Sequence, residues 1–505
     1  MSHDTFKAQA ARLAEHLSLT YGLKLKHHAA LNAVAALHGA RNWNTLVSSP
    51  ATTTPSLANA PATQTGQELL DQWSNFSCEH PILRAMSEER LRYLGAQDSL
   101  TQPLLAGTPG AVQSVEYRAG LLAQMADGAP ALVTLQGKAN SSFALVGCSG
   151  SGKTLMLSEA ICDTLRHNGS VHVLEEGYSL RSFCQVMGGQ HRVLSPAAPI
   201  SLNPFLACRN DAEFFTYVQS LATELMLEVL EHHAPELRAV PFSYSVVEQL
   251  LTNAWKQSQQ KTTFAQVLGG LAKYPHPHLQ SAAQKALGGW SVIDPWADAQ
   301  VCTNDFDQSL LVYEFEDLAA DALLHKVVVQ LAAIQSTLGL SRKAPGVPKL
   351  LAIEETDYVL KGLMRPRFWL DALHMLQSIG AGVGYTLQSP AYRFGSDVLD
   401  TLIQNTPTLL CTQLSPDAAV SLVIRTPWAS APGALELLQS TRKQGPHGFV
   451  LLQANCAPTA MKFELDPMTR LTLSTNPTYA KARQSLKGSL ADVARQLKSL
   501  AQQMN

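Results

Sequence analysis

One stretch of the sequence decides the fold: Gly147-Cys148-Ser149-Gly150-Ser151-Gly152-Lys153-Thr154. It fits the P-loop pattern, in which a glycine and four free positions precede Gly-Lys-Thr or Gly-Lys-Ser. The apolar residues 143–146 predict a buried strand before the loop. Residues 155–166 predict a helix after it, which stops at Asn168-Gly169. Strand, glycine loop and helix are the context that the motif requires, so we expect this stretch to bind a nucleoside triphosphate.

The chemistry of such a loop assigns a role to each part of residues 147–154. Without side chains at Gly150 and Gly152, the backbone can wrap a phosphate, and its N–H groups and the helix N-terminus point at the anion. Lys153 would reach the β- and γ-phosphates, and the Thr154 hydroxyl would hold Mg²⁺. The alternative is a chance glycine-rich turn, which the correct strand and helix on either side disfavour.

The composition limits the class of protein. With 505 residues the chain is too long for one ordinary core, and two to four domains are expected. The net charge of −2 gives no general attraction to nucleic acid or anionic lipid, so such a contact would need a local patch. Eight cysteines without metal-site spacing suggest reduced thiols in a cytosolic protein. No apolar run has membrane-spanning length, and the N-terminus does not resemble a signal peptide.

The chain divides by composition and periodicity into seven predicted parts. The alternation of strands and helices begins before the P-loop, is interrupted by a region of helical periodicity alone, and then resumes. The parts are a small helical unit at 1–48, an Ala/Thr/Ser/Pro linker at 49–68, a lead-in segment at 69–130 with helices near 69–76, 87–94 and 115–125, a P-loop half at 131–208, a helical insertion at 209–299, a second half at 300–476 and a C-terminal helix at 477–505.

The predicted fold class is α/β, because buried strands alternate with helices on both sides of the insertion. Such alternation favours a mostly parallel sheet that is covered on both faces. The predicted strands after the P-loop helix are 171–174, 310–315, 350–355, 383–388, 408–412 and 448–452.

Hydrolysis of a nucleoside triphosphate requires a second acidic hold on Mg²⁺ and a group that polarises the attacking water. Glu354 and Glu355, which end an apolar strand, supply both positions of a Walker B motif. Glu354 would reach the metal, and Glu355 would be the general base. The pair could instead be a solvated strand end. The rival strand ends in Glu314, followed by Glu316-Asp317.

Two further kinds of residue are candidates. Gln388 ends the strand after the Walker B strand and could hydrogen-bond the γ-phosphate or the attacking water. Ring-forming motors often insert an arginine of the neighbouring subunit into the site. Arg425 and Arg442, the latter followed by Lys443, are candidates for that role, although each could be an ordinary surface residue.

An ordered series of motifs resembles the TraC-like conjugative-transfer ATPases, the motor family of type IV secretion. The series spans roughly residues 130–476 and is more specific than the P-loop alone. It includes the P-loop, Leu174-Glu175-Glu176-Gly177-Tyr178-Ser179, Gly188-Gly189-Gln190, Ser201-Leu202-Asn203-Pro204-Phe205, residues 312–318, Glu354-Glu355, Thr386-Leu387-Gln388-Ser389, residues 405–408, residues 465–468 and residues 474–476.

This resemblance implies a RecA-like ATPase domain with a helical insertion, with ATP and Mg²⁺ as ligands. It also implies a hexamer that works with components of a membrane secretion channel, at the cytoplasmic side of the membrane. The chain departs from the family in three places. Glu354 stands where Asp is usual, Gln377-Ser378 stand where an Arg-Lys pair is common, and the short N-terminal unit replaces a large domain.

Three functions are therefore open from the sequence. The first is an ATPase motor for conjugative transfer or type IV secretion. The second is a DNA-translocating or coupling-type motor with the same core, for which DNA would be a partner. The third is a nucleotide-gated scaffold that binds ATP and hydrolyses it poorly, since the longer side chain of Glu354 could weaken the hold on Mg²⁺.

Overall fold

The structure is a computed structural model of the chain. It describes residues 79–95, 120–125, 130–135, 140–240, 242–300, 306–388, 397–426, 433–441, 448–454 and 456–503. The predicted helical unit at 1–48 and the linker at 49–68 lie outside the described residues and stay predictions. So do Ser389 and the expected helix near 69–76.

Eleven strands of the described residues form one sheet in the order β2-β1-β11-β10-β9-β3-β8-β7-β4-β6-β5. From β9 to β5 every neighbouring pair is parallel. The wing from β10 to β2 is antiparallel. The sheet is thus mostly parallel, as predicted. The strands are β1 Gly120–Met125, β2 Pro130–Thr134, β3 Phe143–Val146, β4 Ser170–Glu175, β5 Gln190–Val193, β6 Leu310–Glu314, β7 Lys349–Ile353, β8 Ala381–Leu387, β9 Thr408–Cys411, β10 Gly448–Gln453 and β11 Thr459–Lys462.

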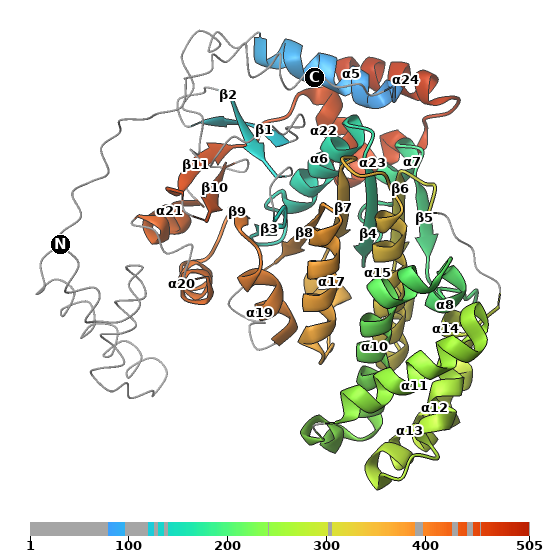
Figure 1. Cartoon of the computed structure of the whole chain (residues 1–505). Helices are drawn as coiled ribbons and strands as arrows, with labels where there is room; N and C mark the ends of the chain where they lie inside the picture. The colour runs from blue at the N-terminus through green and yellow to red at the C-terminus, as the bar shows by residue number, and fades with distance from the viewer. Residues whose placement is uncertain are drawn as a thin grey trace, which may run out of the picture.

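Helices cover both faces of the sheet (Figure 1). The strands read as apolar runs because their side chains alternate between two cores. In β3, Ala144 and Val146 face one core, and Phe143 and Leu145 face the other. The first core includes helices α15 Ala322–Ser341, α17 Pro366–Ser378 and α19 Asp397–Gln404. The second includes α6 Lys153–Arg166, α7 Arg181–Val186, α22 Pro467–Leu473, α24 Leu490–Gln503 and α5 Pro81–Gly95.

Helix α15 is the one helix of the described residues that is long and apolar enough to cross a membrane. It packs against β4, β7 and α17, and 94% of its apolar window is buried inside the protein. Its apolar character is therefore accounted for by its place in the core of the domain.

Between β5 and β6 the described chain forms helices without a strand. They project together below the sheet in Figure 1. These elements include α8 Pro204–Ala207, α9 Asp211–Glu213, η1 Phe214–Val218, α10 Gln219–His233, η2 Pro235–Ala239, α11 Ser243–Ser258, α12 Phe264–Leu271, α13 Pro277–Gly289 and α14 Asp294–Ala297. Helix α10 packs on both α15 and α17, so it joins this region to the face of the sheet.

The lead-in segment was predicted wrongly in its last part. The apolar run at 115–125 was expected to be helical, yet residues 120–125 form strand β1, which pairs antiparallel with β2 and β11. The missing side chain of Gly120 makes the first pairing possible, because a Cβ there would lie 2.5 Å from the Val133 carbonyl oxygen. A short apolar run cannot decide between strand and helix by itself, and here the pairing with distant strands decides it.

The C-terminal segment was predicted as one helix and forms two. Helix α23 Pro477–Gln484 ends before Gly488, and α24 begins at Leu490. Gly488 has a φ of +105°, which favours glycine and turns the chain between the two helices. Ser489 and Asp492 hydrogen-bond each other across the first turn of α24, with Ser489 Oγ donating to Asp492 Oδ2 at 2.7 Å.

Candidate active site

The P-loop lies between the end of β3 and the start of α6, at the carboxyl edge of the parallel strands. Gly150 and Gly152 have φ values of +75° and +93°, and a Cβ at either would meet no atom within 4 Å. These glycines are thus required by the backbone conformation and leave open space over the loop. Gly147 is required by close approach, since a Cβ there would lie 1.9 Å from Thr412 Oγ1.

The loop is supported from the end of β9, a contact that the sequence analysis missed. Ser151 Oγ and Thr412 Oγ1 hydrogen-bond at 2.6 Å, and Cys148 N donates to the Gln413 carbonyl oxygen at 3.4 Å. The signal that could have revealed Thr412 is its place directly after a buried parallel strand, where side chains meet the sheet's carboxyl edge. Ser149 is exposed on the loop and has no such support.

Lys153 is held against the loop. Its side chain is nearly buried, and its Nζ donates to the Cys148 carbonyl oxygen at 3.0 Å. Burial lowers the pKa of Lys153, while Glu355 and Glu354 oppose that shift. The two acids predicted as the Walker B pair are therefore the charges that act most strongly on this ammonium group.

The strand order explains how those acids reach the loop across 200 residues of sequence. Strand β8 lies between β3 and β7, so the ends of the P-loop strand and the Walker B strand are two positions apart. The Thr154 hydroxyl donates a hydrogen bond to Glu354 Oε1. Glu354 is 1% exposed, and burial raises the pKa of its carboxyl to about 7, although the bond from Thr154 opposes that rise.

These two side chains fit a divalent cation. Glu354 Oε2 is a buried oxygen without a hydrogen-bond partner in the described structure. A hydroxyl and a buried carboxylate with a free oxygen are the kind of hard oxygen ligands that Mg²⁺ takes beside nucleotide phosphates. Glu354 is longer than the Asp that is usual at this position in the family, and its carboxylate nevertheless remains in hydrogen-bond contact with Thr154.

Glu355 has a left-handed backbone, with φ +53° and ψ +48°, which is uncommon for a residue other than glycine. Its N–H donates to Thr386 Oγ1 at 2.9 Å, and Gln388 Nε2 donates to its Oε2. The Gln388 N–H in turn donates to Asp357 Oδ2 at 2.9 Å. The structure thus brings the predicted pair Glu355 and Gln388 together. It adds Thr386 and Asp357, which sequence reasoning did not assign.

Comparison with known proteins is consistent with this geometry. The family model of the TraG P-loop domain matches residues 129–267, which include β3, the P-loop and α6. Residues 129–267 are thus similar to a TraG P-loop domain. The predicted resemblance to the P-loop ATPases of conjugative transfer and type IV secretion is thereby confirmed.

Solved structures share the fold. VirB4 of Thermoanaerobacter pseudethanolicus superposes with a TM-score of 0.51 at 13% identity, over 71% of this chain and all of that chain. The unbound monoclinic form of the bacterial conjugative coupling protein TrwBdeltaN70 gives 0.46 at 16% identity, over 69% of this chain and 90% of that one. TrwB with ADP and Mg²⁺ gives 0.43 at 16% identity, over 64% and 85%. At such identity the likeness to VirB4 concerns the fold alone.

The N-terminal part has a different match. Residues 1–91 match the family model of a glyoxalase superfamily protein, and only residues 79–91 of that range are described. No curated protein matches the chain.

The rival carboxylates lie away from the P-loop. Strand β6, which ends in Glu314, is two positions beyond β7. Glu314 is fully buried and accepts hydrogen bonds from the backbone N–H groups of Gly177, Tyr178 and Glu316 at 3.1, 2.6 and 2.9 Å. Its oxygens are thus occupied by the chain itself.

Of the two candidate arginines, the structure describes Arg425 alone. Arg442 and Lys443 lie outside the described residues. Arg425 Nη1 lies 2.7 Å from both carboxylate oxygens of Asp400, so this arginine is tied to a residue of its own chain. The role of a neighbour's arginine stays a prediction.

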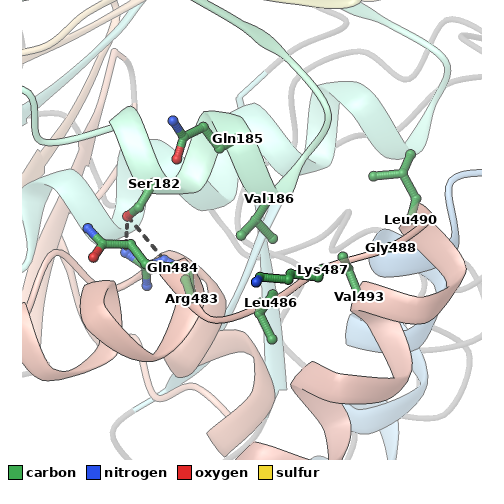
Figure 2. Close-up of a pocket in the computed structure, with 10 residues that line it drawn as sticks. All are labelled: Ser182, Gln185, Val186, Arg483, Gln484, Leu486, Lys487, Gly488, Leu490 and Val493. Carbon is green, nitrogen blue, oxygen red and sulfur yellow. Dashed lines mark hydrogen bonds between the residues drawn. The ribbon is translucent and has the colours of Figure 1, made fainter.

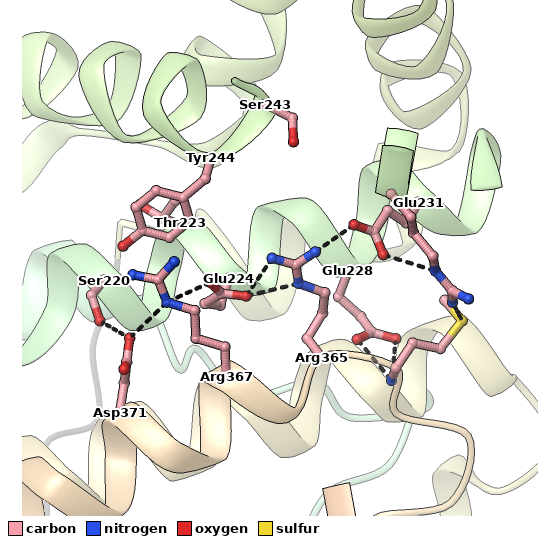
Figure 3. A network of polar contacts seen from close by, with 12 residues as sticks. Ser220, Thr223, Glu224, Glu228, Glu231, Ser243, Tyr244, Arg365, Arg367 and Asp371 are labelled. Carbon is pink, nitrogen blue, oxygen red and sulfur yellow. Dashed lines mark hydrogen bonds and ion pairs between the residues drawn. The ribbon is translucent and has the colours of Figure 1, made fainter. Parts of the chain in front are cut away.

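A polar network joins the start of α17 to helix α10 of the helical region (Figure 3). Helix α10 directs Glu224, Glu228 and Glu231 toward the start of α17, and all three side chains are almost fully buried. Arg365 forms ion pairs with Glu224 and Glu231, and Met364 N donates to Glu228 at 3.0 Å. The chain that follows Glu355 is therefore fixed to α10 about ten residues later.

Proposed function

We propose that the TraG P-loop domain of this chain binds ATP with Mg²⁺ and hydrolyses it to ADP and phosphate. The observation that carries this proposal is the meeting of four side chains from distant parts of the sequence at one sheet edge. They are Lys153 and Thr154 on the loop, and Glu354 and Glu355 after β7.

In the proposed reaction, the N–H groups of residues 147–154 and Lys153 bind the β- and γ-phosphates. Thr154 and Glu354 would hold Mg²⁺, which supplies charge neutralisation at the phosphates when bound. Glu355 would accept the proton of the attacking water. Gln388, which donates to Glu355, would orient that carboxylate and contact the γ-phosphate or the water.

We propose that this hydrolysis drives conjugative transfer or type IV secretion. The chain would then act as an oligomer, a hexamer in the simplest case, at the cytoplasmic side of a membrane secretion channel. The match to the TraG P-loop domain supports this choice. The network between Arg365 and α10 fixes the chain that follows Glu355 to the helical insertion.

The experiment is ATP turnover by the purified full chain, measured as phosphate release with and without Mg²⁺ and with and without single-stranded or double-stranded DNA. Mg²⁺-dependent turnover supports the ATPase. Stimulation by DNA would favour the DNA-translocating alternative over a motor for protein secretion. Tight ATP binding with negligible turnover under all conditions would favour the nucleotide-gated scaffold.

A further inference from the structure

A cleft of about 340 Å³ lies between helix α7 and the turn that joins α23 to α24 (Figure 2). It is lined by residues of the P-loop half and of the C-terminal segment, about 300 positions apart in sequence. One part of its wall is apolar, formed by Val186, Leu486, Leu490 and Val493. None of the ten described residues that line it is acidic.

Arg483 on this wall is a buried cation with neutral partners. Its side chain is 3% exposed, and Nη1 donates to the Leu471 carbonyl oxygen at 2.6 Å. Nε and Nη2 donate to Ser182 Oγ at 3.2 and 2.7 Å. These three bonds use three of the five N–H groups of a guanidinium. No ion pair joins Arg483 to a carboxylate among the described residues.

An uncompensated buried charge is costly, because burial removes water that would otherwise stabilise it. Burial lowers the pKa of Arg483 to about 10, which still leaves the guanidinium charged at neutral pH. An anion that entered the cleft would therefore recover an electrostatic stabilisation that the folded chain alone does not provide.

Lys487 adds a second cation to the same cleft. Its side chain is exposed, while its backbone is held by Gln496, whose Nε2 donates to the Lys487 carbonyl oxygen at 2.6 Å. The nearby acid Asp492 does not line the cleft. It accepts bonds from Ser489 and pairs with Arg495 on its own helix.

We propose that this cleft binds a small soluble phosphate ester, with its phosphate beside Arg483 and Lys487 and its organic part against the apolar wall. The donors on the polar side are a guanidinium, an ammonium, the Ser182 hydroxyl and the amides of Gln185 and Gln484. Phosphate matches them because it carries up to two negative charges and three strong acceptor oxygens. A carboxylate has one charge and two oxygens.

The test is calorimetric titration of the full chain with phenyl phosphate, which combines a phosphate with an apolar ring. We expect saturable binding at one site. Lys487→Glu should weaken it at least about tenfold, since a charged hydrogen bond is lost and a repulsion is added. Lys481→Glu is the matched control, because Lys481 is an exposed lysine of α23 that does not line the cleft. It should leave the affinity unchanged.

Two further variants distinguish binding in this cleft from binding elsewhere on the chain. Lys153→Ala should leave the binding intact; its loss in that variant would assign the signal to the P-loop and overturn the proposal. Arg483→Gln should abolish binding, and circular dichroism verifies that this variant is folded. If Arg483→Gln unfolds, Lys487→Glu provides the test.

Equal binding of phenol would show that the phosphate is not recognised. Absence of phenyl phosphate binding, with attachment instead to phosphatidylcholine vesicles that contain phosphatidic acid, would also overturn the proposal.

Discussion

Two pairs of carboxylates lie at the carboxyl ends of parallel strands, and they differ in what surrounds their oxygens. Glu354 and Glu355 follow β7 and face Thr154, Gln388 and Lys153. The second pair, Glu175 and Glu314, ends the neighbouring strands β4 and β6, where the two residues are register partners.

The second pair is enclosed by the chain itself. His191 Nε2 lies 3.0 Å from Glu175 Oε1, and Ser179 Oγ and Leu180 N donate to Glu175 Oε2 at 3.1 and 2.9 Å. Glu314 accepts three backbone N–H groups. The first pair keeps an unpartnered oxygen on Glu354 and faces the P-loop. The difference indicates that the first pair is suited to chemistry and the second to fixing the loop at 176–180.

The largest expected effect is that of Lys153→Ala. Removal of the ammonium takes away the charged contact with the β- and γ-phosphates, so ATP affinity should fall at least about tenfold and turnover should fall to background. Equilibrium binding of a fluorescent ATP analogue and phosphate release measure the two quantities. Lys361→Ala, at an exposed lysine six residues after Glu355, is the control. Unchanged hydrolysis in the Lys153 variant would refute the assignment of this site.

Glu355→Gln should reduce turnover by about 10²–10⁴-fold, the usual contribution of a general base, and should leave ATP binding intact. Gln cannot accept the proton of water, yet it retains the size of the side chain. Size-exclusion chromatography with ATP should then detect an ATP-bound assembly. Glu316→Gln, at an exposed acid just after β6, should leave turnover unchanged. Equal effects of the two variants would contradict the role of Glu355 as the general base.

Glu314→Gln should act on stability. The amide nitrogen that replaces one carboxylate oxygen cannot accept a hydrogen bond. Either the Tyr178 N–H or the N–H groups of residues 177 and 316 therefore lose their acceptor, and the free energy of unfolding should fall by about 1–3 kcal/mol. Chemical denaturation measures that change. Turnover per folded molecule should stay within about twofold of the unsubstituted chain, since Glu314 lies away from the P-loop. A selective loss of turnover would make β6 the hydrolytic strand.

The smallest expected effect is a change in how the stability of the folded chain depends on pH. Burial and the nearby Glu175 raise the pKa of Glu314 to about 8, while its backbone N–H bonds oppose the rise. A carboxyl with a raised pKa in the folded state contributes stability at low pH, and that contribution is lost as the pH rises through the folded value. His191 and Glu175 face the group from β5 and β4.

Thermal unfolding from about pH 5 to about pH 9 should therefore show a decline for the unsubstituted chain that Glu314→Gln reduces. Because all other titrating groups are shared, the difference between the two curves isolates Glu314. Parallel curves would show that Glu314 does not titrate in this range.

The P-loop and the acids Glu354, Glu355 and Glu314 were predictable as motifs, because each depends on a local pattern of apolar residues followed by glycine or acid. The pairing of Glu314 with Glu175 was not, because it depends on the register of β4 and β6. The ranking of the acids was predictable only in part. Glu314 and Glu354 each follow an apolar run. The order of the strands in the sheet decides which of these two acids contacts Thr154, and that order brings together residues that are 200 positions apart in the sequence.

The antiparallel wing was not predictable in the same way. Strand β1 forms because it pairs with β2 and with β11, and β11 lies more than 300 residues later in the sequence. The run at 120–125 has no alternation that separates strand from helix. Thr386 and Thr412 were also missed, because a threonine at a strand end is an ordinary β-sheet residue until its neighbours are known.

The most direct test of the central claim compares Glu355→Gln and Glu314→Gln in one experiment, as ATP bound and ATP hydrolysed per folded chain. We predict that Glu355→Gln retains binding and loses hydrolysis, whereas Glu314→Gln retains both and loses stability. Hydrolysis that survives Glu355→Gln and is lost in a folded Glu314→Gln variant would contradict the account.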